Sequence, residues 1–208
     1  MIGIICPSSF EYDILNQKPL ASYEYEIIVS GMGKVRALYA CSRLKAKHPS
    51  LKALLLIGFA GGLTPSLNIG DVVEPGILIE QDYNAEPFEV FPNSILSPYP
   101  QLLSYSSRAT ILTQDRFLTE NPYRYSAYSE KYQRLACDME SYAVAYYATQ
   151  ENIPFFTIKW ISDTANHTAS HDFLANCQSL APRLNQSLQE ALQVLQESCF
   201  EKDITHAH

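Results

Sequence analysis

Residues 135–173 read LACDMESYAVAYYATQENIPFFTIKWISDTANHTASHDF, and this stretch decides the fold. The acidic motif Asp138-Met139-Glu140-Ser141 opens a run of alanines and aromatic residues that is typical of a buried helix. An apolar run from Phe155 to Ile161 then predicts a strand, and Ser162-Asp163 follows it. One carboxylate therefore lies at the start of a helix and another where a strand ends, which is where α/β sheets bind their ligands.

A third carboxylate has a similar place near the amino terminus. Ile2-Gly3-Ile4-Ile5 predicts a buried first strand, and Glu11 follows just beyond its end. Each acid also has a purely structural interpretation, because Glu11 could be a solvated loop residue, Glu140 could stabilise a helix N-terminus and Asp163 could cap the next helix. If the three converge, they suit acid–base cleavage of a glycosidic bond without a metal. The spacing alone leaves this open.

Two glycine-rich segments lie between these acids. Gly31-Met32-Gly33-Lys34 follows a strand expected over residues 25–30 and opens a helix expected to end near Lys47. It lacks the known phosphate-binding patterns, so tight turn geometry is the favoured explanation. Gly58-Phe59-Ala60-Gly61-Gly62 follows a strand expected over residues 51–57. Its glycines allow the backbone to approach either a neighbouring element or a flat ligand.

The remaining segments continue the alternation of strands and helices. We expect strands around residues 72–73, 76–81 and 109–113, a long, partly ordered loop from Asp82 to Ser107, and a short irregular helix over residues 121–131. The closing helix, from Ser170 to Glu197, contains Pro182, which should kink or restart it. This pattern predicts a single α/β domain over residues 1–208, with a central mixed sheet flanked by helices on both faces.

Composition excludes several classes of protein. The chain has 208 residues, 47% hydrophobic and 18% charged, which is typical of a globular domain. Its formal charge of -7 includes no basic stripe, so neither nucleic acid nor an anionic membrane surface is an expected partner. Five scattered cysteines without a CxxC pair indicate reduced thiols and no zinc site. Because the start also lacks a basic signal-peptide region, we expect a cytoplasmic location.

The order of the motifs resembles the nucleoside phosphorylase superfamily. The segments that carry the resemblance are Gly31-Met32-Gly33-Lys34, Gly58-Phe59-Ala60-Gly61-Gly62-Leu63, Asp138-Met139-Glu140-Ser141 and Ile161-Ser162-Asp163. Within that superfamily the chain looks most similar to the 5'-methylthioadenosine/S-adenosylhomocysteine nucleosidases and to the futalosine hydrolases of menaquinone synthesis. The resemblance implies a nucleoside phosphorylase-like fold, a small nucleoside substrate, a homodimer and no cofactor.

Carried over position by position, the resemblance implies catalytic roles for the carboxylates. Asp163 matches the general acid that protonates N7 of the purine, so that the base leaves as a neutral group. Glu11 matches the carboxylate that activates the attacking water. Glu140 matches the residue that holds the ribose 2'- and 3'-hydroxyls, and Met139 matches the side chain that packs against the sugar.

The same resemblance implies the residues that surround the base and the 5'-group. Phe117 matches the aromatic ring that stacks on the purine, and the backbone of Leu118 should read the purine edge. On residue type alone, a core side chain is the favoured interpretation of Phe117. Ala60 and Gly61 are expected to line the base and sugar region, and Phe173 to form an apolar wall of the 5'-substituent site.

Three departures from the family pattern bear on the substrate. Phe59 replaces a small hydroxyl residue that holds phosphate in the phosphorylases, which favours water as the nucleophile and removes a hydrogen-bond partner expected for Asp163. Ser8 replaces a common methionine near the sugar. Lys159 replaces a common arginine and either meets a carboxylate on the substrate's 5'-extension or is a solvated lysine at the end of a strand.

The leading hypothesis is an N-ribohydrolase that acts on a 5'-modified purine nucleoside. Aminofutalosine or futalosine and 5'-methylthioadenosine or S-adenosylhomocysteine are the candidate substrates. Two alternatives are a phosphate-dependent nucleoside phosphorylase and a nucleoside-binding protein without catalysis. The loss of the hydroxyl at Phe59 argues against the first, and the retention of all three carboxylates argues against the second.

Overall fold

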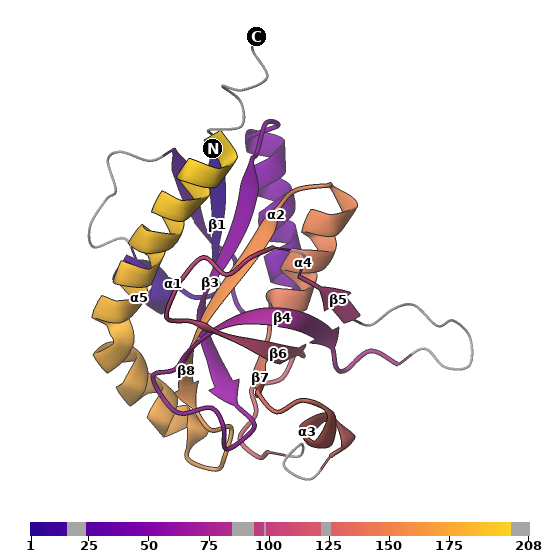
Figure 1. Cartoon of the computed structure of the whole chain (residues 1–208), viewed down its shortest axis with the longest axis vertical. Coiled ribbons are helices and arrows are strands. Elements are labelled where there is room, and N and C mark those ends of the chain that lie inside the picture. Colours follow the sequence, from indigo (N-terminus) through magenta and orange to yellow (C-terminus); the bar gives the residue numbers. More distant parts are fainter. Residues whose placement is uncertain (16–23, 85–93, 98, 122–125, 201–208) are drawn as a thin grey trace.

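The computed structural model of the chain describes residues 1–15, 24–84, 94–97, 99–121 and 126–200. Within these ranges eight strands form one mixed sheet flanked by helices (Figure 1). The strands are β1 (Ile2–Cys6), β2 (Tyr25–Val29), β3 (Ala53–Gly62), β4 (Val72–Glu80), β5 (Ser94–Leu96), β6 (Ser107–Thr113), β7 (Leu135–Asp138) and β8 (Phe155–Asp163). The helices are α1 (Ser9–Leu15), α2 (Lys34–Lys47), α3 (Ala127–Lys131), α4 (Ser141–Gln150) and α5 (Ala169–Phe200).

Five of the strands close into a ring. β3 pairs with β8, β8 with β4, β4 with β6, β6 with β7, and β7 returns to β3. β1 and β2 extend the sheet from the other side of β3. Because β1, β3 and β8 are parallel, their carboxyl ends lie at one edge, and the end of β7 meets β3 there through the Gly61–Cys137 pair. This edge is the expected place for a site.

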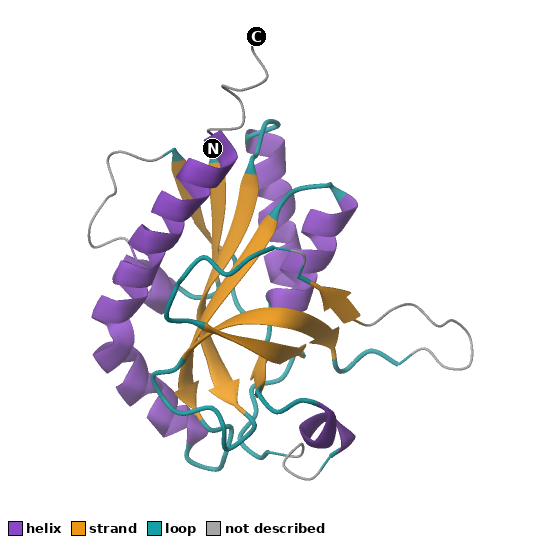
Figure 2. Ribbon diagram, in the orientation of Figure 1, coloured by secondary structure: helices purple, strands orange, loops and turns teal. Residues whose placement is uncertain are grey.

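Helices cover both faces of the sheet, as the sequence predicts (Figure 2). α2 packs against α4 on one face, and α1 packs against α5 on the other. β3 and β8 are buried along their whole length because both of their faces are covered. None of the helices in the described part of the chain is long and apolar enough to cross a membrane.

Several boundaries differ from the prediction. β3 runs through the glycine segment instead of ending before it, and residues 72–80 form one strand, whose pairing shifts at Pro75–Ile77, instead of two. The four-residue β7 escaped prediction because so short an apolar run does not distinguish a strand from a helix. α5 is a single helix that continues through Pro182, so the predicted restart is wrong.

The described residues of the loop expected from Asp82 to Ser107 contain the strand β5. β5 pairs antiparallel with β4 in its middle, at Leu78 and Ile95, and Ser107 already begins β6. Residues 85–93 and 98 lie outside the described part of the chain, as do residues 122–125 of the expected irregular helix. Residues 127–131 of that expected helix form α3.

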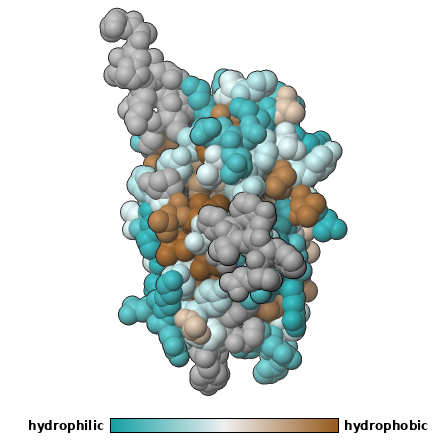
Figure 3. Space-filling model, turned by 90° about the vertical axis from the view of Figure 1, so that its right-hand side faces the viewer, coloured by the Kyte–Doolittle hydropathy of each residue, from teal (hydrophilic) through white to brown (hydrophobic). Residues whose placement is uncertain are grey.

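One surface exposes apolar side chains at helical spacing. At the start of α2, Val35 is 79% exposed and Tyr39 is 64% exposed, and Met32, just before the helix, is 53% exposed. Figure 3 views the molecule from the side that carries α4 and β5 and shows apolar surface at mid-height. Single apolar residues are normal on protein surfaces, whereas a stripe along one helix indicates a contact face.

Candidate active site

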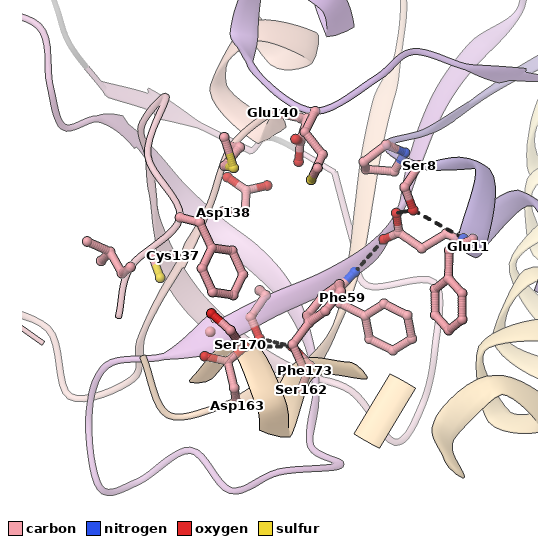
Figure 4. Close-up of a pocket in the computed structure, with 18 of the residues that line it drawn as sticks. Ser8, Glu11, Phe59, Cys137, Asp138, Glu140, Ser162, Asp163, Ser170 and Phe173 are labelled. Carbon is pink, nitrogen blue, oxygen red and sulfur yellow. Dashed lines mark hydrogen bonds between the residues drawn. The ribbon is translucent and has the colours of Figure 1, made fainter. Parts of the chain in front are cut away.

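A cavity of about 500 Å³ opens at the carboxyl ends of β1, β3, β7 and β8. All ten candidate residues from the sequence line it, so the three carboxylates do share one site (Figure 4). They are Ser8, Glu11, Ala60, Gly61, Phe117, Leu118, Met139, Glu140, Asp163 and Phe173. The ten residues come from six separate segments of the chain, which the fold brings together.

Glu11 reaches the cavity from the first turn of α1. Its Oε1 accepts the Phe59 N–H at 3.1 Å, and its Oε2 accepts the Ser8 hydroxyl at 2.5 Å. A Cβ atom at Gly58 would lie 2.4 Å from Oε1, so only glycine fits beneath this carboxylate. Burial raises the pKa of Glu11, while the Lys159 ammonium and the Ser8 and Phe59 donors oppose that rise.

Asp163 ends β8 beside a bulge. Ile161 and Asp163 pair with consecutive residues of β3, so Ser162 is the extra residue, and bulges of this kind re-aim side chains next to active sites. Asp163 accepts the Ser162 hydroxyl and the Ala165 N–H, each at 2.8 Å. Ala165 supplies that N–H from a left-handed backbone, with φ of 49°. Burial raises the pKa of Asp163, against these two donors.

Phe59 removes a hydrogen-bond partner that the family pattern leads us to expect for Asp163, and these contacts show which donors Asp163 has in this chain. The missing hydroxyl at position 59 leaves Asp163 with two donors from its own neighbourhood, Ser162 and Ala165. A Cβ atom at Gly61 would lie 3.0 Å from the Asp163 Oδ1, so the backbone of β3 comes close to this acid as well. The glycines of β3 thus serve the approach of neighbouring side chains, the first of the two predicted alternatives.

Glu140 lies between β7 and α4 and is almost fully buried. Its Oε1 accepts the Gly33 N–H at 3.0 Å, from a backbone with φ of 105° that favours glycine. Its Oε2 lies 3.5 Å from the Lys159 Nζ. Burial raises the pKa of Glu140 to about 7, with Lys159 opposing the rise and Asp138 adding to it.

Lys159 contradicts both sequence predictions, because it is neither solvated nor among the residues that line the cavity. It is completely buried in β8, and its Nζ lies 3.0 Å from the Asp138 Oδ2. Burial disfavours its charge, but Asp138, Glu140 and Glu11 together raise its pKa. A buried ammonium group is costly unless carboxylates lie close to it, and here the carboxylates belong to other elements of the fold.

Aromatic rings form one wall of the cavity. Phe173, from the first turns of α5, packs edge-on against Phe117 at 5.8 Å and against Phe59 at 6.0 Å between ring centroids. Phe117 is 40% exposed, so one side of its ring is open to a flat ligand. Phe59 is buried, and its side chain serves as support for Phe173.

Sequence reasoning missed several lining residues. Phe10, Arg116, Cys137 and Leu174 each stand next to a residue that was singled out, so adjacency was the available signal. Met32 lies inside the first glycine turn, which brings it to the rim. Pro7 and Ser170 also line the cavity and had no signal of their own.

The site holds no cluster suited to a metal ion. Among the residues that the structure describes, no group of three His, Cys, Asp or Glu side chains could hold one. Asp138, the remaining buried acid of the site, instead accepts the hydroxyls of Thr113 and Ser141 besides its contact with Lys159. The partners of Asp138 in the site are therefore two hydroxyls and the ammonium of Lys159.

The sequence matches known proteins over most of its length. The family model described as the phosphorylase superfamily matches residues 20–193. The 5'-methylthioadenosine/S-adenosylhomocysteine nucleosidase of Shewanella oneidensis is 30% identical over 173 residues, which are 74% of this chain and 72% of that protein. The enzyme of the same name from Bacillus cereus is 29% identical and covers 74% of each chain.

Solved structures share the fold. The 5'-methylthioadenosine/S-adenosylhomocysteine nucleosidase of Streptococcus pneumoniae with a transition-state inhibitor superposes with a TM-score of 0.78, at 27% identity over 93% of this chain and 99% of that one. The futalosine hydrolase of Helicobacter pylori gives 0.80, at 20% identity over 92% of this chain and 97% of that one. At 20% identity, the similarity to the futalosine hydrolase shows a shared fold only.

Proposed function

Because the chain belongs to the phosphorylase superfamily, we propose that it is an N-glycosidase that hydrolyses the bond between a purine and the ribose of a 5'-modified nucleoside. The observation that carries the proposal is the meeting of three buried carboxylates, Glu11, Glu140 and Asp163, in one cavity with an aromatic wall. Relatives of about 30% identity that are named nucleosidases support the same chemistry.

Burial raises the pKa of all three carboxylates, but the groups that oppose the rise differ: Lys159 acts on Glu11 and Glu140, and the Ala165 and Ser162 donors act on Asp163. Asp163 has a raised pKa, so it can hold a proton and donate it to N7 of the purine. As the C1'–N9 bond breaks, its electron pair leaves with the base and positive charge develops on the ribose. Glu11 takes a proton from the attacking water, whose oxygen bonds to C1'. One carboxyl group loses a proton while the other gains one, and solvent restores both.

Glu140 holds the substrate in this proposal. A carboxylate can accept both vicinal hydroxyls of a ribose, and the Gly33 N–H and Lys159 fix its orientation. Met139 packs against the sugar, and the open side of Phe117 stacks on the base next to the Leu118 backbone. Gly33, at 3.0 Å, and Lys159, at 3.5 Å, hold the Glu140 carboxylate in place before the substrate binds.

The 5'-substituent lies against an apolar end of the cavity. Phe173, Phe59, Phe10 and Leu174 line or support this end. This surface accepts the methylthio group of 5'-methylthioadenosine and the aryl group of aminofutalosine or futalosine. Because Lys159 is buried in the protein and does not line the cavity, it is not placed to bind the carboxylate of a longer 5'-group.

The first experiment measures purine release from 5'-methylthioadenosine, S-adenosylhomocysteine, aminofutalosine and futalosine, with and without phosphate. We expect release from at least one nucleoside at the same rate in both conditions. Strict dependence on phosphate would instead establish a phosphorylase, and binding without release would establish a binding protein. The preferred nucleoside identifies the 5'-group.

Substitution of the acid tests the mechanism. Asp163→Asn keeps the shape of the side chain but removes the proton donor, so turnover should fall about 10²- to 10⁴-fold while nucleoside binding is retained. Asp71→Asn is the matched control, since Asp71 caps a turn at Asn68 and does not line the cavity. Wild-type turnover in Asp163→Asn would refute the assignment, and so would an equal loss in the control.

The proposed enzyme is a homodimer. The exposed apolar stripe of Met32, Val35 and Tyr39 is the face that a second copy would cover, and Met32 also lines the cavity. A partner subunit seated there would lie at the rim of the site. Apolar faces of this kind are the usual core of homodimer interfaces.

A further inference from the structure

Ser8 contacts the first turn of α1 through both its backbone and its hydroxyl. Its carbonyl accepts the Tyr12 N–H at 3.0 Å, which makes Ser8 the N-cap of α1. Its hydroxyl oxygen accepts the Glu11 N–H at 3.2 Å, and the Ser8 backbone in turn contacts the Glu11 carboxylate. Ser8-Ser9-Phe10-Glu11 is therefore a capping box, in which the third residue of the helix reaches back to the cap.

The hydroxyl does more than a capping box requires. Besides accepting from the Glu11 N–H, it donates its own proton to the Glu11 Oε2 at 2.5 Å. The other carboxylate oxygen is held by the Phe59 N–H from β3 at 3.1 Å. Two donors from two separate elements thus grip the two oxygens, which fixes the plane of the carboxylate inside the cavity (Figure 4).

We propose that Ser8 is a positioning residue for the reaction: its hydroxyl holds the Glu11 carboxylate ionised and aimed at the attacking water. This inference rests on the proposed function, in which Glu11 is the base. It adds a role to the expectation that Ser8 replaces a common methionine near the sugar. A methionine at this position has no proton to donate and could not take this part.

The charged groups around Glu11 explain why the Ser8 hydroxyl affects the ionisation of this carboxylate. Lys159 is the cation that faces Glu11, and it is shared with Asp138 and Glu140. Glu140 adds a second negative charge nearby, and the buried thiols of Cys6 and Cys177 also face the carboxylate. Burial works against the ionised form, so each remaining donor shifts the balance toward it.

The expected sign follows from which form the hydroxyl stabilises. A donor to the ionised carboxylate lowers its pKa, so loss of the hydroxyl raises the pKa of Glu11. A protonated Glu11 cannot take a proton from water, so the acidic limb of the kcat profile should move to higher pH. We expect a shift of about one pH unit, since one charge-assisted hydrogen bond is removed.

Two variants separate this role from helix capping. Ser8→Gly removes the hydroxyl but keeps the backbone N–H, and glycine is nearly as good an N-cap as serine. Ser8→Thr keeps both the hydroxyl and the cap. Circular dichroism and thermal unfolding of both variants check that α1 is retained.

The titration of Glu11 is measured directly by ¹³C NMR of the labelled side-chain carboxyl, assigned with Glu11→Gln, in the wild type and both variants. The kcat–pH profile at saturating nucleoside is the second measurement. We expect the Glu11 resonance and the acidic limb to shift together in Ser8→Gly and to stay at wild-type positions in Ser8→Thr. An unshifted Ser8→Gly, or an equal shift in Ser8→Thr, would overturn the proposal.

The two measurements also separate this inference from the proposed function. If the wild type releases no purine from any nucleoside, the proposed function fails and Ser8 has no reaction to serve. If the wild type is active but the Glu11 resonance of Ser8→Gly stays in place, only the role of Ser8 fails. Misfolding of Ser8→Gly would show in the melting curve, and Ser8→Ala then replaces it with the same expected shift.

Discussion

Lys159 places one positive charge among three buried carboxylates, those of Asp138, Glu140 and Glu11. One cation cannot neutralise all three, so at least one of the acids is driven toward its protonated form. Glu140, with a pKa of about 7, is the acid most nearly balanced between its two forms near neutral pH. Its charge state, and with it the proposed binding of the ribose hydroxyls, therefore changes in the physiological range.

Nucleoside binding should weaken as the pH falls through 7. Glu140 accepts hydroxyls best when ionised, and its raised pKa means that the ionised form dominates only above about pH 7. From pH 8 to pH 6 the Kd should rise about tenfold, because at one unit below the pKa roughly a tenth of the carboxylate is ionised. Calorimetric titration of the inactive Asp163→Asn variant measures this without turnover.

Glu140→Gln in the same background is the control for that titration. Glutamine keeps an acceptor oxygen but does not titrate, so its Kd should be higher at pH 8 and flat with pH. A wild-type Glu140 that binds equally at pH 6 and pH 8 would contradict the assignment of this residue to the ribose.

Among single residues, the ten candidates from the sequence line one cavity, whereas both predictions for Lys159 are wrong. Most of the ten lie at or just after the carboxyl ends of strands, and the fold brings these ends together at the cavity. Lys159 was misplaced because its partners, Asp138 and Glu140, lie on a different strand and a different loop. No local sequence pattern around Lys159 predicts that two carboxylates lie next to its ammonium group.

Among the elements, the start of α2 and the loop after β6 are joined by a ring of polar contacts. The Asp115 Oδ1 accepts the Lys34 N–H at 2.8 Å, and the Asp115 N–H donates to the Asp82 Oδ2 at 2.9 Å. The Lys34 Nζ closes the ring on Asp82 and also bonds to Glu80 at 2.8 Å. Because Gly33 has no side chain to cap α2, Asp115 caps it from another element.

This ring connects the two halves of the cavity. Gly33, on one side of it, holds Glu140, and Phe117, two residues after Asp115, forms part of the wall. Asp115→Ala should therefore raise KM several-fold with a smaller effect on kcat, and should lower the free energy of unfolding by about 1 kcal/mol. Steady-state kinetics and urea unfolding measure the two effects.

Asp115→Asn and Asp71→Ala sharpen that comparison. Asparagine keeps an acceptor for the Lys34 N–H and should recover most of the KM. Asp71 also accepts a backbone N–H in a turn, from Asn68, but away from the cavity, so Asp71→Ala should cost stability without changing KM. A KM that follows stability in all three variants would contradict a link between the ring and the site.

The elements themselves were predictable in proportion to their length and periodicity. α2 was predicted at its observed start, because a glycine turn precedes it and its period is regular. β7 and β5 were not, because four and three residues carry no period of their own and are held by pairing with β6 and β4. The union of residues 72–80 into one strand likewise depends on its neighbours, which pair with it on both sides.

For the whole molecule, the exposed stripe on α2 predicts self-association. Met32, Val35 and Tyr39 expose apolar surface beside the cavity, and burial against a second copy would remove it from water. Sedimentation analysis should give a dimer for the wild type and a monomer for Val35→Glu. Gln178→Glu, an exposed change on α5, is the control and should remain a dimer. A monomeric wild type would leave the stripe without the proposed partner.

β3 joins the centre of the molecule to its chemistry. It begins among buried leucines and ends at Gly61 and Gly62, and the amide of Phe59 within it bonds to Glu11. A strand that is buried from end to end opens to solvent only when the whole domain unfolds. The Phe59 amide should then be among the last to exchange its hydrogen for deuterium. We therefore expect thermal inactivation to follow global unfolding, since the carboxylate of Glu11, the proposed base, is held by an amide of this strand.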